Sequence, residues 1–353
     1  MNFLKNYKKY LYISFFVLVL FLIKFSTSNV YANIYKIEDI NVKEPYDVNF
    51  DKTKVVDKAF KIAFRELIKK TIKTKNIKLV DNIKIEEIKK LIDSFEIIDE
   101  NFVNKNYSAL FNVSFEKKKF LNYLIKKNIF SSIPIQKKIF LIPIYINLEE
   151  NQILLFSENK FYLNWNKQIQ KHHLLNYVLP NEELDDLVVI KKNIKNIEEY
   201  DFKEIINKYE LYDHIILFIY ENDQNLNTLT KINLNNKTYI LRNKFPKVSE
   251  DNLSTINLLK NSYEDQWKDL NIINTSIKLK IKLNIKANDY KKINFLEQYL
   301  NKMDLVNNFK IDMFTNEDVV YEIIYNGTPD KFLFEFEKED IKIDISKDLW
   351  EIK

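Results

Sequence analysis

The densest group of residues that could do acid–base chemistry follows Pro180, where Glu182, Glu183, Asp185 and Asp186 lie close together. Paired carboxylates at the end of a strand can act as general acid and base, or bind a cation. The same residues suit the first turn of a helix, where acids complement the positive end of the helix dipole. The helix N-terminus is the simpler interpretation. Asp185 and Asp186 stay candidate binding residues, and the hydrolase alternative rests on them.

The chain has three histidines, His172, His173 and His214. Adjacent residues point to opposite sides of a strand, or far apart around a helix, so His172 and His173 cannot easily share one metal. His214 opens an apolar segment typical of a buried strand, where a histidine is usually a satisfied structural residue. We therefore expect no metal site.

Nucleophile and cofactor motifs are limited by composition. Ser131, Ser132 and Ser157 could serve a serine hydrolase, but none lies in a recognisable nucleophile elbow. The absence of cysteine excludes thiolate chemistry, disulfides and a lipoprotein anchor. The single glycine, Gly327, excludes P-loops and dinucleotide fingerprints, which need several glycines at fixed spacing. We expect no catalytic residue of these classes and no cofactor, and we expect Asn and Asp to form the turns.

Three tryptophans, Trp165, Trp267 and Trp350, could stack on the sugars of a glycan. A tryptophan between apolar neighbours is more often a packing residue, which is the simpler interpretation. Trp165 stays a weak candidate for binding.

The elements that would position these residues alternate between strands and helices. Long apolar segments at 138–148 and 213–220 predict buried strands of a mostly parallel sheet covered on both faces. A hairpin around Asn235-Asn236 and an amphipathic helix over 249–271 extend this unit. Earlier in the chain, the pattern predicts strands at 34–42, 96–103 and 107–115, with helices at 54–74, 85–92 and after Phe115. The small Ala59 and Ala63 would let the first of these helices approach a sheet closely.

The last part of the chain has a separate pattern of expected strands and helices. Alternating strand and helix patterns predict the β-α-β-β-α-β order of a ferredoxin-like domain. The expected segments are 276–285, 290–302, 305–313, 319–325, 328–338 and 340–345. The fold class is therefore α/β and α+β, with units at 33–134, 135–275 and 276–353.

Residues 1–32 resemble a secretory leader. Three lysines precede an apolar run of about 14 residues, shorter than the ~20 that a membrane-spanning helix needs, and Val30-Tyr31-Ala32 suits a signal peptidase. We expect cleavage after Ala32 and a periplasmic location. The alternative is an uncleaved leader that tethers the chain to the inner membrane.

The leader also holds most of the excess positive charge. The full chain has 55 Lys and Arg against 50 Asp and Glu, and four of the lysines lie in residues 1–32, so the mature chain has a net charge of +1. This balance argues against a nucleic-acid partner.

Several segments resemble a proteobacterial envelope family known as domain-of-unknown-function family 2066. They are IYKIEDINV followed by AFKIAFREL, NYSALFNVSFEKKKFLNYLIKKNIFSSIP, KIFLIPIYIN followed by Trp165 and LPNEELDDL, and the closing β-α-β-β-α-β unit. This chain departs from the family in having one glycine. The resemblance implies export to the periplasm and a non-catalytic role. We therefore expect a binding or assembly module whose partner is an envelope protein or cell-wall component, with a periplasmic hydrolase as the alternative.

Overall fold

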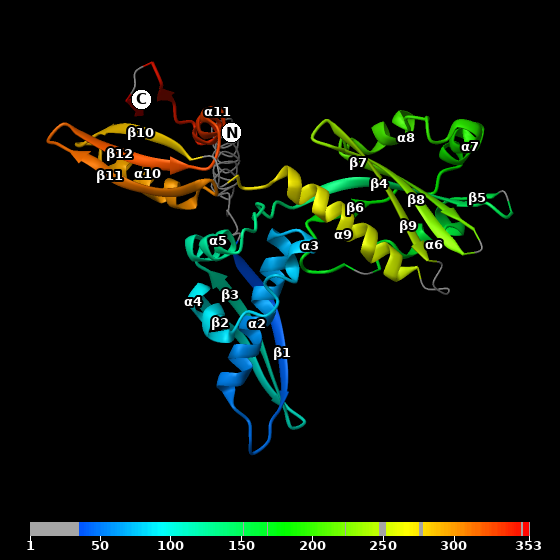
Figure 1. Cartoon of the computed structure of the whole chain (residues 1–353), viewed down its shortest axis with the longest axis horizontal. Helices are drawn as coiled ribbons and strands as arrows, with labels where there is room; N and C mark the ends of the chain where they lie inside the picture. The colour runs from blue at the N-terminus through cyan, green and yellow to red at the C-terminus, as the bar shows by residue number, and fades with distance from the viewer. Residues whose placement is uncertain are drawn as a thin grey trace, which may run out of the picture.

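The computed structural model describes residues 35–150, 152–167, 169–222, 224–246, 252–274, 278–346 and 349–352. It is a mixed α/β protein with three separate sheets (Figure 1). We call the segments 35–126, 137–270 and 279–352 the N-terminal, central and C-terminal units. The expected α/β and α+β class is confirmed. The leader and its cleavage site after Ala32 lie outside the described residues.

In the N-terminal unit, helix α2 covers one face of a three-stranded antiparallel sheet of order β1-β3-β2. Ala59 and Ala63 of this helix are fully buried, as expected for small residues that let the helix approach the sheet closely. The helix begins at Lys52 because the Asp51 carboxylate accepts the Thr53 N–H at 2.8 Å. The elements are β1 (Lys36–Pro45), α2 (Lys52–Thr71), α3 (Thr74–Ile77), α4 (Ile85–Leu91), β2 (Ile92–Val103), β3 (Asn106–Phe115) and α5 (Lys117–Lys126).

The central sheet is mixed, which corrects the expectation of a mostly parallel one. Strand β4 is parallel to β6 and β7, whereas the β4–β5, β7–β8 and β8–β9 pairs are antiparallel. Short connections cause this, because strands joined by tight turns can only pair antiparallel. The turn at Asn235-Asn236 has positive φ at both residues, as the predicted hairpin requires. The strands are β4 (Lys137–Asn147), β5 (Gln152–Leu154), β6 (Leu175–Val178), β7 (His214–Glu221), β8 (Asn225–Leu234) and β9 (Lys237–Pro246).

Helices cover both faces of the central sheet, as predicted. Helix α7 and helix α8 pack on one face through Ile190, Ile205 and Ile206. Helix α9 packs on the other face with its Tyr263 and Trp267. The helices are α6 (Lys160–Asn164), α7 (Leu184–Lys192), α8 (Lys203–Ile206) and α9 (Leu253–Leu270).

The C-terminal unit follows the predicted β-α-β-β-α-β order with one addition at its end. The fourth strand, β13, is separated from the first strand, β10, by the final strand β14, so the sheet order is β11-β12-β10-β14-β13. Strand β14 runs parallel to β10 and carries Trp350, whose ring lies 6.0 Å from that of the buried Phe332. The elements are β10 (Leu279–Lys286), α10 (Tyr290–Lys302), β11 (Val306–Phe314), β12 (Asp318–Tyr325), α11 (Pro329–Glu337), β13 (Ile343–Asp344) and β14 (Trp350–Ile352).

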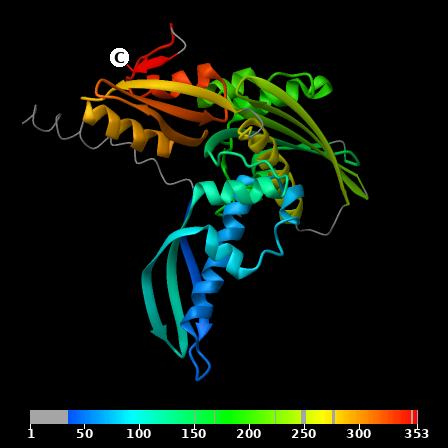
Figure 2. The same cartoon turned by 60° about the vertical axis from the view of Figure 1, so that its left-hand side comes forward.

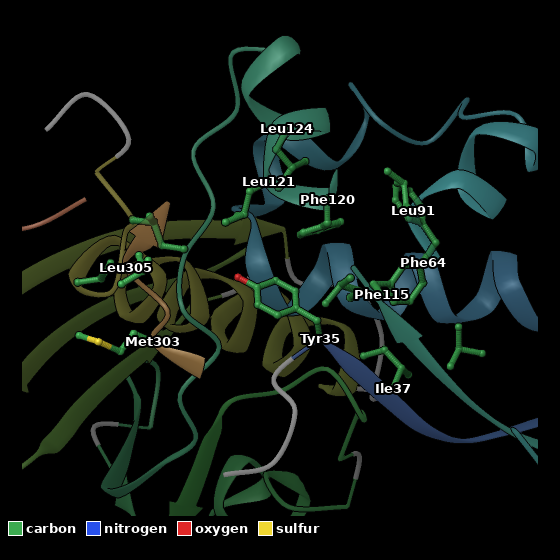
Figure 3. Close-up of a cluster of buried hydrophobic side chains, with 14 of the residues drawn as sticks. Tyr35, Ile37, Phe64, Leu91, Phe115, Phe120, Leu121, Leu124, Met303 and Leu305 are labelled. Atoms are coloured by element: carbon green, nitrogen blue, oxygen red, sulfur yellow. The ribbon is translucent and has the colours of Figure 1, made fainter. Parts of the chain in front are cut away.

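The N-terminal and C-terminal units share one continuous hydrophobic core, although the whole central unit separates them in the sequence. Tyr35, Phe120 and Leu121 of the first unit lie on one side of this contact, and Met303 and Leu305 of the last unit lie on the other (Figure 3). Beside them, Lys117 Nζ donates to the Met303 carbonyl at 2.6 Å and lies 3.6 Å from the Asp304 carboxylate.

The central unit is an insertion whose entering and leaving segments pair with each other. The Ile133 N–H donates to the Asn271 carbonyl at 2.9 Å, and the Ile273 N–H donates to the Ser131 carbonyl at 2.8 Å. In two views the N-terminal unit projects downward, away from the other two units (Figures 1 and 2).

Turns without glycine are formed mostly as the sequence predicted. In the described part of the chain, six of the ten non-glycine residues with positive φ are Asn or Asp. Gly327 has no positive φ; instead, a Cβ added there would lie 2.6 Å from Cε1 of the buried Tyr325. Close packing therefore explains this glycine, and a left-handed turn does not.

We expect Phe120→Ala to lower the stability of both units that share the core. Phe120 is fully buried, and such truncations cost about 3–5 kcal/mol. In a Trp165→Phe/Trp267→Phe background, Trp350 fluorescence during urea denaturation reports on the C-terminal unit. Its transition should move to lower urea, whereas Ile125→Ala, at an exposed position on the same helix, should leave it within about 1 kcal/mol. An unchanged Trp350 transition in Phe120→Ala would show that the two cores are independent.

Candidate functional site

The acidic residues after Pro180 form the start of helix α7. Glu183 is its N-cap residue, and Asp185 and Asp186 lie in its first turn. Asp185 is exposed, whereas Asp186 is 2% exposed and its Oδ1 accepts from Lys208 Nζ at 2.6 Å. Lys208 also donates to Glu183 at 2.7 Å, and these two hydrogen bonds raise the pKa of the lysine. The two aspartates therefore face different surroundings, and the arrangement agrees with the interpretation as a helix N-terminus.

Trp165 is fully buried in the core of the central unit. Its ring is stacked on Tyr263 at a centroid distance of 6.2 Å, and the edge-to-face contact with Tyr177 is 5.5 Å. Trp267 is also buried, and its indole N–H donates to the Ile135 carbonyl at 2.7 Å. Both rings pack inside the protein, so neither offers a face to a glycan.

The remaining candidates for nucleophilic chemistry have structural partners. The Ser132 hydroxyl donates to the Thr71 carbonyl at 2.9 Å, and the Ser157 hydroxyl donates to Glu182 at 2.9 Å. His214 Nδ1 lies 2.8 Å from the Tyr212 carbonyl, at the start of strand β7. Within the described ranges, no group of three or more His, Asp or Glu side chains is arranged to hold a metal ion.

The structure brings together a different set of ionisable side chains where α2, α9 and the segment before β6 meet. This junction cluster consists of Glu66, His172, His173, Glu264 and Lys268. His172 Nδ1 lies 3.4 Å from Glu66 Oε2, which joins the central unit to the N-terminal unit. Burial acts to raise the pKa of Glu66, but the neighbouring His172 and Lys69 outweigh it and hold that pKa below its usual value.

Glu264 is the most enclosed acid of the junction cluster, at 3% exposed. Its Oε1 accepts two backbone N–H groups, from Leu174 at 2.9 Å and Leu175 at 2.8 Å. Its Oε2 is buried, with no hydrogen-bond partner among the described residues. Burial raises the pKa of this carboxyl even though the two amide bonds favour the ionised form. Glu264 therefore anchors the chain just after His173 onto helix α9.

The lysine of the cluster joins two units through a backbone carbonyl. Lys268 Nζ donates to the carbonyl of Lys69 on α2 at 2.6 Å, and burial lowers its pKa. Nearby, Asp265 accepts from the Thr74 N–H at 2.8 Å, and Lys73 forms an ion pair with Asp269. Helix α9 is thus attached to the end of α2 by several polar contacts.

A polar cavity of about 290 Å³ lies against this cluster. Gln170, His172, His173, Glu264 and Lys268 line it from the central unit, and Lys69 and Thr74 line it from the N-terminal unit. Perturbed ionisable groups that gather in a cavity between units indicate a candidate functional site. Here Glu66, His172 and Lys268 make contacts between the N-terminal and central units, and Glu264 binds backbone N–H groups of its own unit. The arrangement can therefore hold the units together more readily than it can activate a nucleophile.

The sequence offered only a weak signal for this cluster. Lys260, Glu264 and Lys268 follow one another at four-residue spacing on α9, a pattern that usually marks exposed ion pairs on a helix surface. All three are buried in the structure, beside the predicted apolar face that carries Tyr263 and Trp267. No pattern in the sequence distinguishes a charge that faces another unit from one that faces water.

We expect Asp185→Asn and Asp186→Asn to differ in stability. Asp186→Asn weakens a charge-assisted bond to Lys208 at a buried position, which should lower the unfolding free energy by about 1–3 kcal/mol. Asp185→Asn changes an exposed side chain and should stay within about 0.5 kcal/mol. Urea denaturation followed by circular dichroism measures both. Equal losses for the two variants would contradict the burial difference between them.

We expect His173 to make the protein less stable in acid. Burial, with the charges of His172, Lys260 and Lys268, lowers the pKa of His173 to about 4. The unfolded chain therefore takes up this proton first as the pH falls, and the stability due to neutral His173 is lost between about pH 6.5 and pH 4. Between pH 7 and pH 5 this amounts to roughly 2 kcal/mol.

His173→Gln should remove that share of the pH dependence while keeping a side-chain acceptor for the Gln170 N–H. The measurement is the difference in unfolding free energy between pH 7 and pH 5 for both proteins. The Hε1 resonance of His173 in proton NMR should titrate near pH 4. A titration near pH 6.5 would show that the imidazole is solvated.

The comparisons with known proteins leave these sites to be judged on geometry alone. No family model matches the chain, and no curated protein matches it. The resemblance to domain-of-unknown-function family 2066, which rests on the order and spacing of elements, therefore stays a prediction.

Proposed function

We propose that the mature chain is a periplasmic binding or assembly module of the cell envelope, without catalytic activity of its own. The observation that carries this proposal is the junction cluster, in which His172 pairs with Glu66 and Lys268 donates to the Lys69 carbonyl across the boundary between the N-terminal and central units. Groups held in this way maintain the geometry of the N-terminal and central units and leave their outer surfaces for partners. The leader, with its expected cleavage after Ala32, supports export.

The proposal allows two cellular locations, which depend on whether the leader is cleaved. In the described part of the chain, no helix is long and apolar enough to cross a membrane. Cleavage after Ala32 would release the protein into the periplasm, and an uncleaved leader would tether the same units to the inner membrane. In either form the expected partner is an envelope protein or a cell-wall component.

The alternative, a hydrolase that uses Asp185 and Asp186, receives less support from the geometry. Asp186 is enclosed and bonded to Lys208, and Asp185 is exposed in the first turn of a helix. One feature favours the alternative, because Asp186 Oδ2 is buried without a hydrogen-bond partner among the described residues. Asp186→Asn, if folded, would abolish a hydrolytic phenotype and would leave a binding role intact.

We expect the protein to be exported and to form a specific complex that depends on the junction. Expression of the full chain in a Gram-negative host should yield a periplasmic protein whose first residue by mass spectrometry is Asn33. Gentle crosslinking followed by purification should then retain one defined envelope partner. Asp265→Ala/Asp269→Ala removes the two carboxylates by which α9 holds Thr74 and Lys73, and it should reduce partner recovery several-fold.

Asp201→Ala/Glu204→Ala is the matched control, because it also removes two carboxylates, from exposed positions at the start of α8 that lie far from the junction in the sequence. It should retain the partner fully. Recovery of the protein alone, or equal recovery by the junction variant with its melting temperature unchanged, would contradict a scaffold that depends on fixed units.

A further inference from the structure

A second hollow of about 330 Å³ lies in the N-terminal unit, between α2 and the segment that runs from α3 to α4. Its floor is apolar and consists of Phe64, Ile68, Val80 and Ile88, all of which are buried. Ile77 and Ile83 form its half-buried wall. The volume is at the lower end of the range for small-molecule sites.

Two cationic side chains at the rim of this hollow have no hydrogen-bond or ion-pair partner among the described residues. Lys61 and Arg65 line the hollow from successive turns of α2, and both are exposed. Among the described residues, neither makes a hydrogen bond or an ion pair. Lys69, one turn further along, is 3.6 Å from Glu66, and the exposed Asp81 is the one acid on the rim.

The charge of this region differs from that of the rest of the mature chain. Residues 61–90 contain ten Lys and Arg against four Asp and Glu, whereas residues 33–60 and 91–353 contain 41 against 46. A net charge of +6 is thus concentrated in thirty residues of an almost neutral protein. Of these charged residues, Lys61, Arg65, Lys69 and Asp81 line the hollow, and their net charge of +2 attracts ligands of the opposite sign.

The identity of the second cation also matters. The chain has two arginines, Arg65 and Arg242, and lysine supplies the other 53 basic residues. A guanidinium group presents a planar pair of donors that matches a carboxylate, which an ammonium group cannot do. An arginine at the rim of an apolar hollow therefore suits an acid group at the end of an apolar chain.

We propose that this hollow binds a single-chain anionic amphiphile, a medium-chain fatty acid such as dodecanoate, with its carboxylate on Arg65 and Lys61. The acyl chain would lie on Phe64, Ile68, Val80 and Ile88. The apolar side chains of the floor are recessed, so the geometry suits a chain that enters the protein more than a surface that inserts into a bilayer. This inference stands apart from the proposed function, because it concerns one unit and requires no partner protein.

Isothermal titration of the mature protein with dodecanoate, below its micelle concentration, tests the proposal. Dodecyltrimethylammonium, which has the same chain and the opposite charge, and acetate, which lacks the chain, should bind at least about tenfold more weakly. Equal binding of dodecanoate and dodecyltrimethylammonium would overturn the role of the cations. Equal binding of acetate would overturn the role of the apolar floor.

Variants locate the site. Lys61→Gln/Arg65→Gln should weaken dodecanoate binding roughly tenfold or more, and Ile83→Asp should do the same by placing a charge in the half-buried wall. Lys126→Gln/Lys127→Gln, which removes the same charge from exposed positions at the C-terminal end of α5, is the matched control and should leave the affinity unchanged. An equal loss in the control pair would show that binding follows net charge alone.

One further experiment distinguishes binding of a monomeric fatty acid from binding to a membrane surface. Vesicles of phosphatidylglycerol should compete poorly with dodecanoate for the protein. Binding to such vesicles through Lys61 and Arg65, with no measurable binding of monomeric dodecanoate, would overturn the fatty-acid proposal. Failure of this test and failure to find an envelope partner are separate results, because the first uses purified protein only.

Discussion

The architecture depends on the pairing of the two segments that enter and leave the central unit. Ser131 to Ile133 and Asn271 to Ile273 exchange backbone hydrogen bonds, so an insertion of well over a hundred residues is closed at one point. This closure brings the N-terminal and C-terminal units together, and they complete one core around Phe120 and Met303. Without it, the loop entropy of the insertion would oppose that contact.

Buried and half-buried charges at the unit boundaries would be costly if they had no partners, and the protein uses main-chain groups to satisfy them. Glu264 accepts two amide N–H groups, and Lys268 and Lys117 each donate to a carbonyl of another unit. Such hydrogen bonds are directional, and each backbone group that takes part has a fixed position in its own unit. They therefore define how the units are oriented, whereas the apolar core between Tyr35 and Leu305 supplies most of the burial (Figure 3).

Much of the fold could be predicted from local patterns. The period of the apolar residues located α2, α9 and α10, the Asn235-Asn236 turn located the β8–β9 hairpin, and the small Ala59 and Ala63 marked the side of α2 that meets its sheet. The predictions were wrong in two places. The central sheet is mixed, because short connections make three of its strand pairs antiparallel. Strand β14 lies between β10 and β13, and its three residues show no periodicity that could have predicted it.

The sequence by itself determined the mixed α/β class, the absence of thiol and glycine-loop chemistry, and the small charge of the chain beyond residue 32. Only the tertiary structure decided which charged residues face another unit. Glu264 and Lys268 have the spacing of surface residues and are buried, while Asp185 and Asp186 are neighbours with opposite exposure. The physical reason is that helical spacing specifies the side of the helix on which a residue lies, whereas burial depends on what the rest of the chain places against that side.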